Sequence, residues 1–229
     1  MERNINVIDD LDGGKIVVIN DIAFKGRQKI EWPDVEKYLK EFVGEYYSII
    51  ETSDMIYIGS DLPDEFTGSN YTKKLKGALA KAKANAAQGL PELIEIASKK
   101  RFKENLKEKH DSDAKYGWYR YDTKFALPVY NENQELERLN VFQAVLLIRH
   151  AQDGKLYLYD LVNIKKKRVS RLSNKLYGKK LASSFYYSIR SLKICQYEIS
   201  KFSIEFHSKE TCKMADSTMS FYKSSMVLQ

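Results

Sequence analysis

The sequence predicts an α+β protein, with a compact domain over residues 1–164 and a basic extension over residues 165–229. Three observations lead to this fold class. Residues 15–20 form a β-branched run typical of a strand, and residues 69–102 repeat apolar side chains at helical spacing. Residues 117–164 are rich in Trp, Tyr, Thr, Val and Leu, which indicates a mainly antiparallel sheet.

The composition is that of a globular protein. Hydrophobic residues make up 43% of the 229 residues, enough to bury a substantial core. No apolar run approaches the ~18 to 20 residues of a membrane span, and the N-terminus leads into Asp9-Asp10 instead of a signal core. Cys195 and Cys212 both lie in the extension and could pair, but a large domain without a cysteine of its own is typical of a cytoplasmic protein. Because CxxC and HxxxH spacings are missing, we expect no structural metal, and no cofactor is implied.

The N-terminal part is expected to be a strand–helix–strand unit. Lys15–Asn20 follows a Gly-Gly turn and is the first strand, and Met55–Gly59 is the second. Pro33 suits the first turn of the helix between them, and Gly44 stands where the helix would end. The expected core face of that helix consists of Val35, Tyr38, Leu39 and Phe42.

Two helices are expected next, separated by Gly89-Leu90-Pro91. The apolar face of the first consists of Leu75, Leu79, Ala82 and Ala86. The apolar face of the second consists of Leu93, Ile94, Ala97 and Phe102. The lysines of this region lie mostly elsewhere, so the pair is interpreted as a solvated layer packed on a sheet, with direct phosphate binding as the alternative.

A hairpin is expected at Asp153-Gly154, which stands between two apolar runs and suits a type I′ turn. If these two residues are the whole loop, His150 faces Tyr157. Arg149 then faces Leu158 on the other side of the sheet.

The positive charge is concentrated in the extension. Residues 165–229 hold 14 Lys/Arg and 4 Asp/Glu, a net charge of +10, whereas residues 1–164 hold 24 and 27, a net charge of −3. The basic run Lys165, Lys166, Lys167 and Arg168 is therefore the expected contact for RNA or another polyanion.

His110 is the first candidate for catalysis, in the polar stretch Glu108–Asp113 between the helices and the sheet. One interpretation is an ordinary loop histidine with charged neighbours. A metal site with Asp111 and Asp113 is a second interpretation, although three ligands crowded into four residues rarely satisfy one ion. The third interpretation is a general acid or base, because histidine titrates near neutral pH.

Arg149 and His150 form the second candidate pair. They could be a solvated strand end, with Arg149 near Asp160 and His150 stacked on Tyr157. Alternatively, they suit RNA cleavage without a metal, which needs proton transfer and a cation at the phosphorane. Thr123 and the Tyr and basic residues of the neighbouring strand could add hydroxyl and cationic groups to such a site. The Trp and Tyr residues of that strand, interleaved with basic ones, suit stacking of unpaired bases or simple sheet packing.

Several motifs resemble a large polyvalent protein-associated domain of phages and conjugative elements, similar to the barnase–EndoU–colicin–RelE group of small ribonucleases. The likeness covers roughly residues 15–166. Its motifs are Lys107–His110, Tyr116–Tyr119, Tyr121–Pro128, Asn140–Phe142, Ile148–His150, Asp153–Asp160 and Asn163–Lys166. The resemblance does not explain the chain after Lys166, where the family has an acidic linker with proline.

The resemblance implies helices before an antiparallel sheet, and a metal-independent ribonuclease or toxin-like activity that depends on the 2′-hydroxyl. The site residues that it implies are His110, Thr123, Arg149, His150 and Tyr157. The alternative is a non-catalytic module that binds nucleic acid or docks onto a host or phage protein. The ribonuclease hypothesis requires His110 to converge with Arg149 and His150 in one cleft.

Overall fold

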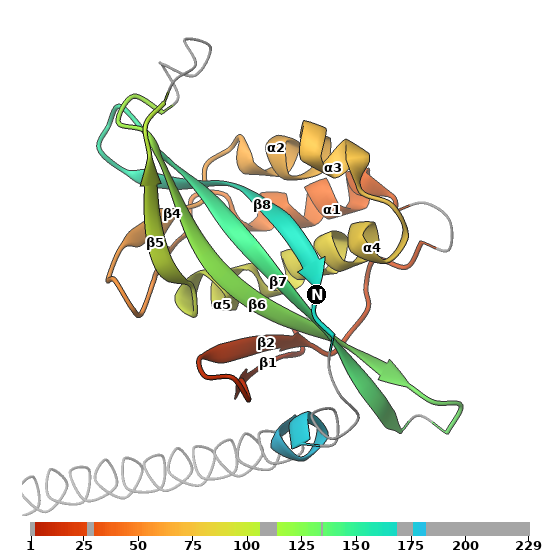
Figure 1. The fold of residues 1–229 in the computed structure, drawn as a ribbon. Helices are drawn as coiled ribbons and strands as arrows, with labels where there is room; N and C mark the ends of the chain where they lie inside the picture. The colour runs from red at the N-terminus through yellow and green to blue at the C-terminus, as the bar shows by residue number, and fades with distance from the viewer. Residues whose placement is uncertain (1–2, 27–29, 106–113, 134, 169–175, 182–229) are drawn as a thin grey trace, which may run out of the picture. The chain divides into compact units, whose positions relative to one another are not determined.

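The computed structural model describes residues 3–26, 30–105, 114–133, 135–168 and 176–181. The chain divides into two units, Met1–Ala182 and Ser183–Gln229, and all described residues belong to the first. That unit is α+β, as expected, with most of its helices on one side of a long, curled sheet (Figure 1). None of the helices in the described part of the chain is long and apolar enough to cross a membrane.

The strands and helices follow each other in a fixed order along the first unit. The strands are β1 (Ile5–Asp9), β2 (Lys15–Ile19), β3 (Tyr46–Ser48), β4 (Met55–Tyr57), β5 (Ser98–Lys103), β6 (Trp118–Tyr130), β7 (Leu136–His150) and β8 (Leu156–Lys166). The helices are α1 (Trp32–Leu39), η1 (Lys40–Phe42), α2 (Leu62–Gly68), α3 (Asn70–Lys74), α4 (Gly77–Ala86), η2 (Ala87–Gly89) and α5 (Leu90–Glu95). A further short helix covers residues 176–181.

The sheet is mixed. Its order is β1-β2-β6-β7-β8-β4-β3, with β5 also paired to β6. The central strands β6, β7 and β8 are antiparallel, whereas β2 runs parallel to β6 and β4 runs parallel to β8. Strands β5 and β2 share one side of β6, since β5 pairs with its first half and β2 with its second. The edge of β5 that faces away from β6 is therefore an outer edge of the sheet.

The helical region ends earlier than expected. Helix α5 stops at Glu95, and Phe102 lies on β5 opposite Tyr119, so the expected helical position of Phe102 is wrong. The backbone of Lys99 has a positive φ of 57°, which is incompatible with a continuing helix. After Ala97 the sequence has only one apolar residue in six, so no apolar stripe remains to hold a helix against the sheet.

The connection between β7 and β8 is longer than a two-residue turn. The Ala151 amide donates to the Lys155 carbonyl at 3.0 Å, which leaves three residues in the loop, and Gly154 has a φ of +78°. Such loops combine a type I turn with a left-handed residue. The expected register is therefore wrong by one residue: Arg149 faces Tyr157, and His150 faces Leu156.

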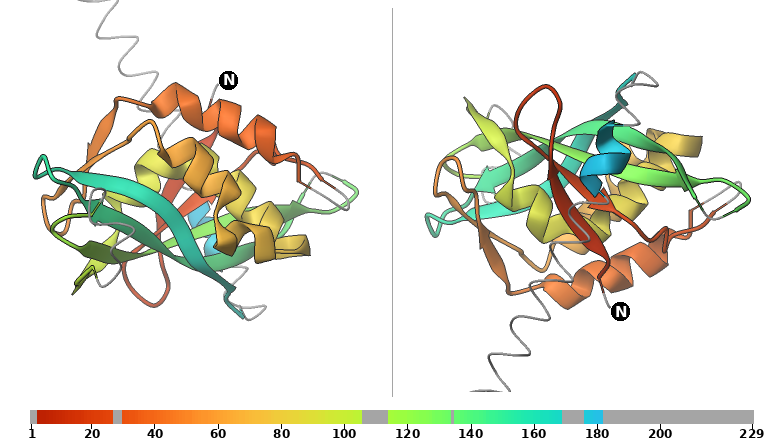
Figure 2. Two further views of the ribbon diagram at one scale, coloured as in Figure 1. Left: turned by 90° about the horizontal axis from the view of Figure 1, so that it is seen from above. Right: turned by 90° about the horizontal axis from the view of Figure 1, so that it is seen from below.

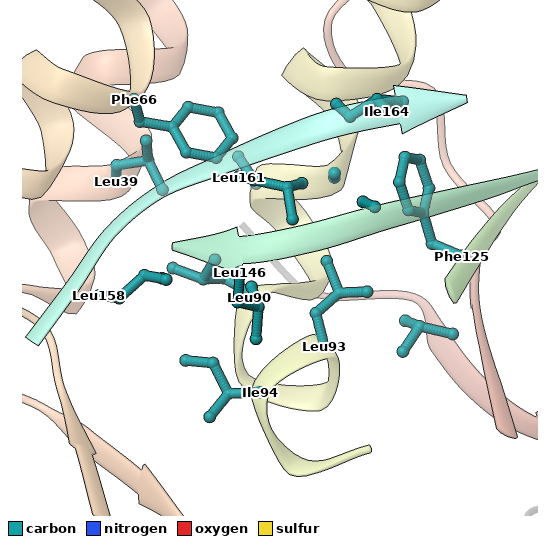
Figure 3. Packing of buried hydrophobic residues seen from close by; sticks show 14 of the residues in the cluster. Leu39, Phe66, Leu90, Leu93, Ile94, Phe125, Leu146, Leu158, Leu161 and Ile164 are labelled. Atoms are coloured by element: carbon teal, nitrogen blue, oxygen red, sulfur yellow. The ribbon is translucent and has the colours of Figure 1, made fainter. Parts of the chain in front are cut away.

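The main core lies between the helices and one face of the sheet (Figure 3). Leu39 and Phe66 come from α1 and α2, and they meet Leu146, Leu158 and Leu161 of the central strands. Helix α1 has Pro33 in its first turn, which the fixed φ of proline suits, and it buries Val35, Tyr38 and Leu39. Helices α1, α2, α4 and α5 all contribute to this core.

A second, smaller core lies on the opposite face, near β1 and β2. It contains Ile16 and Val18 of β2, and Tyr177 and Leu181 from the short helix pack on it. In the view from below, this helix lies beside β1 and β2 (Figure 2). The Tyr177 hydroxyl donates to the Asp10 carboxylate at 2.5 Å. The domain boundary expected at residue 164 stays a prediction, but these contacts tie residues 176–181 to the first unit.

Candidate functional site

Arg149 lies on the face of the sheet that points away from the main core. Its partners in the ladder are Trp118 on β6 and Tyr157 on β8. The guanidinium group lies 5.0 Å from the centre of the Tyr157 ring, and it donates to the Asp61 carboxylate at 3.1 Å. The contact expected with Asp160 is wrong, because a bulge in β8 turns that carboxylate toward the helices.

His150 lies on the opposite face from Arg149, because successive residues of a strand point to opposite faces. Its ring is 5.0 Å from the ring of Tyr116 and 5.9 Å from that of Tyr119. The expected stack of His150 on Tyr157 is therefore wrong. The two residues of the predicted catalytic pair do not point into one cleft.

Thr123 and Tyr157 are both engaged in hydrogen bonds within the protein. The Thr123 side chain is buried, and its hydroxyl donates to the Leu93 carbonyl at 2.9 Å, which ties β6 to α5. The Tyr157 hydroxyl donates to the Asp153 carboxylate at 2.8 Å. That hydrogen bond raises the pKa of Tyr157, so its hydroxyl is a donor and not a base near neutral pH.

The remaining predicted residues lie in the basic run or outside the described part of the chain. His110 belongs to residues 106–113, which the structure does not describe. Lys165, Lys166 and Arg168 are exposed. Lys167 is half-buried and forms an ion pair with Asp12, so it also anchors the end of β8 to the β1–β2 turn.

The strands place one row of aromatic and basic side chains across the face that holds Arg149. We call this set the aromatic row. Its members are Tyr46 on β3, Tyr57 on β4, Tyr157 on β8, Arg149 on β7, Trp118 on β6 and Lys103 on β5, each opposite the next in the ladder. Neighbouring strands are about 4.8 Å apart, so a row over six strands extends about 24 Å.

The three tyrosine rings of the aromatic row contact one another in series. The centres of the Tyr46 and Tyr57 rings are 5.5 Å apart, and those of Tyr57 and Tyr157 are 5.8 Å apart. Lys155 places its ammonium group 4.7 Å from the centre of the Tyr57 ring. Tyr46 is 57% exposed, and Tyr57, Tyr157 and Trp118 are partly exposed. The row therefore combines accessible ring faces with positive charge.

Lys83 forms a buried ion pair that the sequence analysis did not anticipate. Its side chain, expected among the solvated lysines, is fully buried on α4, and its ammonium group lies 2.5 Å from the Asp160 carboxylate. It also donates to Thr72, while Asp160 accepts from Ser69 and from the Leu161 backbone amide. The pair joins α4 and the α2–α3 connection to the bulge of β8.

Burial dominates the electrostatics of this pair. It lowers the pKa of Lys83 and raises the pKa of Asp160, and the attraction between the two opposes both changes. Because each charge is surrounded by hydrogen-bond partners and lies away from solvent, we assign the pair a structural role. Within the described residues, no group of three or more His, Cys, Asp or Glu could hold a metal ion.

Comparison of the sequence with protein-family models and with curated proteins gave no match. The phage-domain resemblance therefore stays a hypothesis.

Sequence analysis missed Tyr46 and Tyr57 as members of a site. Tyr46-Tyr47 and Tyr57 were visible as a tyrosine-rich stretch, but only the pairing of β4 with β8 brings them beside Tyr157. That pairing joins residues about a hundred positions apart, and local periodicity carries no information on such partners.

Proposed function

We propose that the protein binds single-stranded nucleic acid through the aromatic row, as a non-catalytic interaction module. The observation that supports this function is the alignment of four aromatic rings with Arg149 and Lys103 across one open face of the sheet. Unpaired bases stack on aromatic side chains, and nearby cations contact the phosphates. A duplex keeps its base faces stacked inside, so the row favours single strands.

The dimensions of the row suit a short stretch of strand. At the duplex rise of about 3.4 Å per nucleotide, a row of about 24 Å corresponds to roughly seven nucleotides, and to fewer if the strand is stretched. The net positive charge of the chain comes from residues 165–229, because residues 1–164 have a net charge of −3. Lys165, Lys166 and Arg168 are exposed at the start of that extension and can add contacts that do not depend on sequence.

The test is binding of fluorescent single-stranded RNA and DNA to the full chain, followed by anisotropy. Stacking contributes about 1–3 kcal/mol per base, so Tyr46→Ala and Tyr57→Ala should each weaken binding about five- to 150-fold. Tyr130→Ala is the matched control, because Tyr130 is 46% exposed on β6 and lies outside the row. Its affinity should match that of the parent.

Two results would contradict the proposal. A parent chain that binds no single strand at low salt has no such function. If the parent binds but both row variants keep its affinity, the nucleic-acid surface lies elsewhere, and the basic extension becomes its first candidate.

The ribonuclease activity implied by the resemblance is the second proposed function. One observation favours it: the backbone of His150 is hydrogen-bonded to Tyr116 and Gly117, close in sequence to the segment that contains His110. The divided orientation of Arg149 and His150 speaks against it. The origin in a phage or conjugative element, and docking onto a host or phage protein, likewise remain proposals.

Cleavage is tested by a time course on unstructured RNA in excess EDTA. A ribonuclease of this kind cuts RNA but leaves DNA of the same sequence intact, since DNA lacks the 2′-hydroxyl. His110→Ala and His150→Ala should each slow cleavage by the ~10²- to 10⁴-fold that a positioned histidine contributes. If the parent leaves RNA intact over a broad pH range while still binding it, only the interaction module remains.

A further inference from the structure

A second group of aromatic side chains lies on the opposite face of the same end of the sheet. The Phe102 and Tyr119 rings are 5.3 Å apart, and the Tyr116 and His150 rings are 5.0 Å apart. Phe102 is 55% exposed and Tyr116 is 48% exposed. Large rings left this open offer stacking surfaces that the described packing of the protein does not use.

The local sequence places this group directly beside the aromatic row. Lys103, the last member of the row, is the chain neighbour of Phe102, and neighbouring residues of a strand point to opposite faces. Gly117 has a φ of +94°, and a Cβ there would lie 2.7 Å from the Phe102 ring. Only glycine allows both features, so this position lets Phe102 lie against the backbone between Tyr116 and Trp118.

The edge between the two aromatic surfaces is positively charged. Strand β5 holds Lys99, Lys100, Arg101 and Lys103 within six residues. Lys100 is paired with Asp54 and Arg101 with Asp122. For Lys99 and Lys103 the described residues provide no ion pair, and both side chains are exposed. Figure 1 shows β5 at the border of the sheet beside β6.

We propose that a single nucleic-acid strand lying on the aromatic row continues over the outer edge of β5 and stacks on Phe102 and Tyr116. This rests on the function proposed above. The lysines of β5 and Lys115, whose ammonium group lies 5.8 Å from the centre of the Tyr116 ring, contact the phosphates at the crossing. Lysines on an edge β-strand also prevent that edge from pairing with another sheet. Binding measured with nucleic acids of different length distinguishes this protective role from phosphate binding.

If the nucleic acid follows this path, the second aromatic group contributes to affinity only when the nucleic acid is long enough to reach it. A nucleic acid of ~6 nucleotides fits on the aromatic row alone, whereas one of ~18 nucleotides reaches both faces of the sheet. In the full chain, Tyr116→Ala should weaken binding of the long strand at least about five-fold and leave the short strand unchanged. Tyr46→Ala should weaken both, and Tyr130→Ala should weaken neither.

The lysines provide a second readout that does not remove a ring. Each lost phosphate contact lowers the salt slope of single-strand binding by about 0.7. Lys99→Gln and Lys115→Gln should therefore each reduce the slope by about that amount for the long strand only. RNA and DNA strands of both lengths form the arms of the assay, since bases and phosphates are common to both.

The outcomes distinguish this path from the function on which it rests. If the parent binds both lengths, Tyr46→Ala weakens both, and Tyr116→Ala changes neither, the row binds nucleic acid but the strand does not cross β5. If Tyr116→Ala weakens both lengths equally, Tyr116 acts through the fold or the row, and the path is wrong. If the parent binds neither length, the proposed function and the path fail together.

Discussion

Replacing Lys83 by methionine removes the buried charge that faces Asp160 and keeps a side chain of similar length. The lysine is fully buried, so its replacement leaves a carboxylate with only Ser69 and the Leu161 amide as partners. Removing one member of a buried ion pair costs about 3–5 kcal/mol, since the other charge stays buried without compensation. A domain of this size has a total stability of about 5–15 kcal/mol, so the loss is a large share.

The expected loss is measurable as a change in melting temperature. For a domain of 150–250 residues, each kcal/mol lowers the Tm by about 2–4 °C, so Lys83→Met should melt about 6–20 °C below the parent. Lys81→Met is the matched control on the same helix, because Lys81 is partly exposed. A substitution at such a position changes stability by less than about 0.5 kcal/mol.

The loss should also depend on pH. Burial raises the pKa of Asp160, and without Lys83 nothing of opposite charge opposes that rise. A raised folded pKa means that the folded variant binds a proton at a pH where the unfolded chain does not. The variant should therefore regain stability relative to the parent as the pH falls from neutral through that folded pKa, and lose it again as the pH rises.

The double variant Lys83→Met/Asp160→Asn completes the experiment. It removes both charges, and the asparagine oxygen keeps an acceptor for Ser69, so much of the lost stability should return. Urea unfolding of the parent, Lys83→Met, Asp160→Asn and the double variant gives the coupling energy between the two sites. A Lys83→Met variant as stable as Lys81→Met, or a coupling energy near zero, would refute the buried pair.

Three other outcomes are expected. A fragment of residues 1–166 should unfold at lower urea than one of residues 1–182, because the helix at residues 176–181 covers the second core; equal midpoints would show that this helix adds nothing. Burial opposes the charge on Asp10, but the bonds from Lys124 and Tyr177 outweigh it and lower its pKa. That stabilisation is present above the ordinary carboxyl pKa and is lost as the pH falls through the lower pKa of the folded state. The free energy of unfolding, measured by urea titration from pH 6 to 2, should therefore decrease less in Asp10→Asn than in the parent. Replacing the basic run 165–168 by glutamine should weaken polyanion binding and lower its salt slope by about 0.7 per phosphate contact, and an unchanged slope would remove the run from the interface.

Local patterns predicted the type of several elements correctly. The β-branched run at residues 15–20 is β2, and the apolar face around Val35 and Leu39 is buried on α1. The pattern failed where the decisive contact is distant in sequence. Lys83 was expected in solvent because an alanine- and lysine-rich helix looks solvated, and its partner Asp160 is 77 residues away. The bulges in β8, one of them near Asn163 with its positive φ, also cannot be recognised from the periodicity of the sequence.

Part of the candidate site was predicted from the sequence, but from a strand register that the structure corrects. Arg149 and Tyr157 were both named, and they lie together, but through a register one residue away from the expected one. The separation of Arg149 from His150 follows from the two-residue period of a strand alone and needs no register. The neighbours of Arg149 across the sheet, by contrast, depend on a hairpin loop of three residues and on the parallel pairing of β4 with β8.

That separation has a consequence for the choice between cleavage and binding. In-line attack on a phosphodiester needs the base, the acid and the cation around one phosphate, within hydrogen-bond reach. Arg149 contacts Tyr157 and Asp61 on one face of the sheet, whereas His150 contacts Tyr116 and Tyr119 on the other face. Stacking has no such requirement, since each ring acts on its own base. Side chains that alternate between the two faces at this end of the sheet cannot surround a single phosphate, but they can stack on successive bases of a nucleic acid that crosses the edge of β5. The arrangement therefore favours binding and not cleavage.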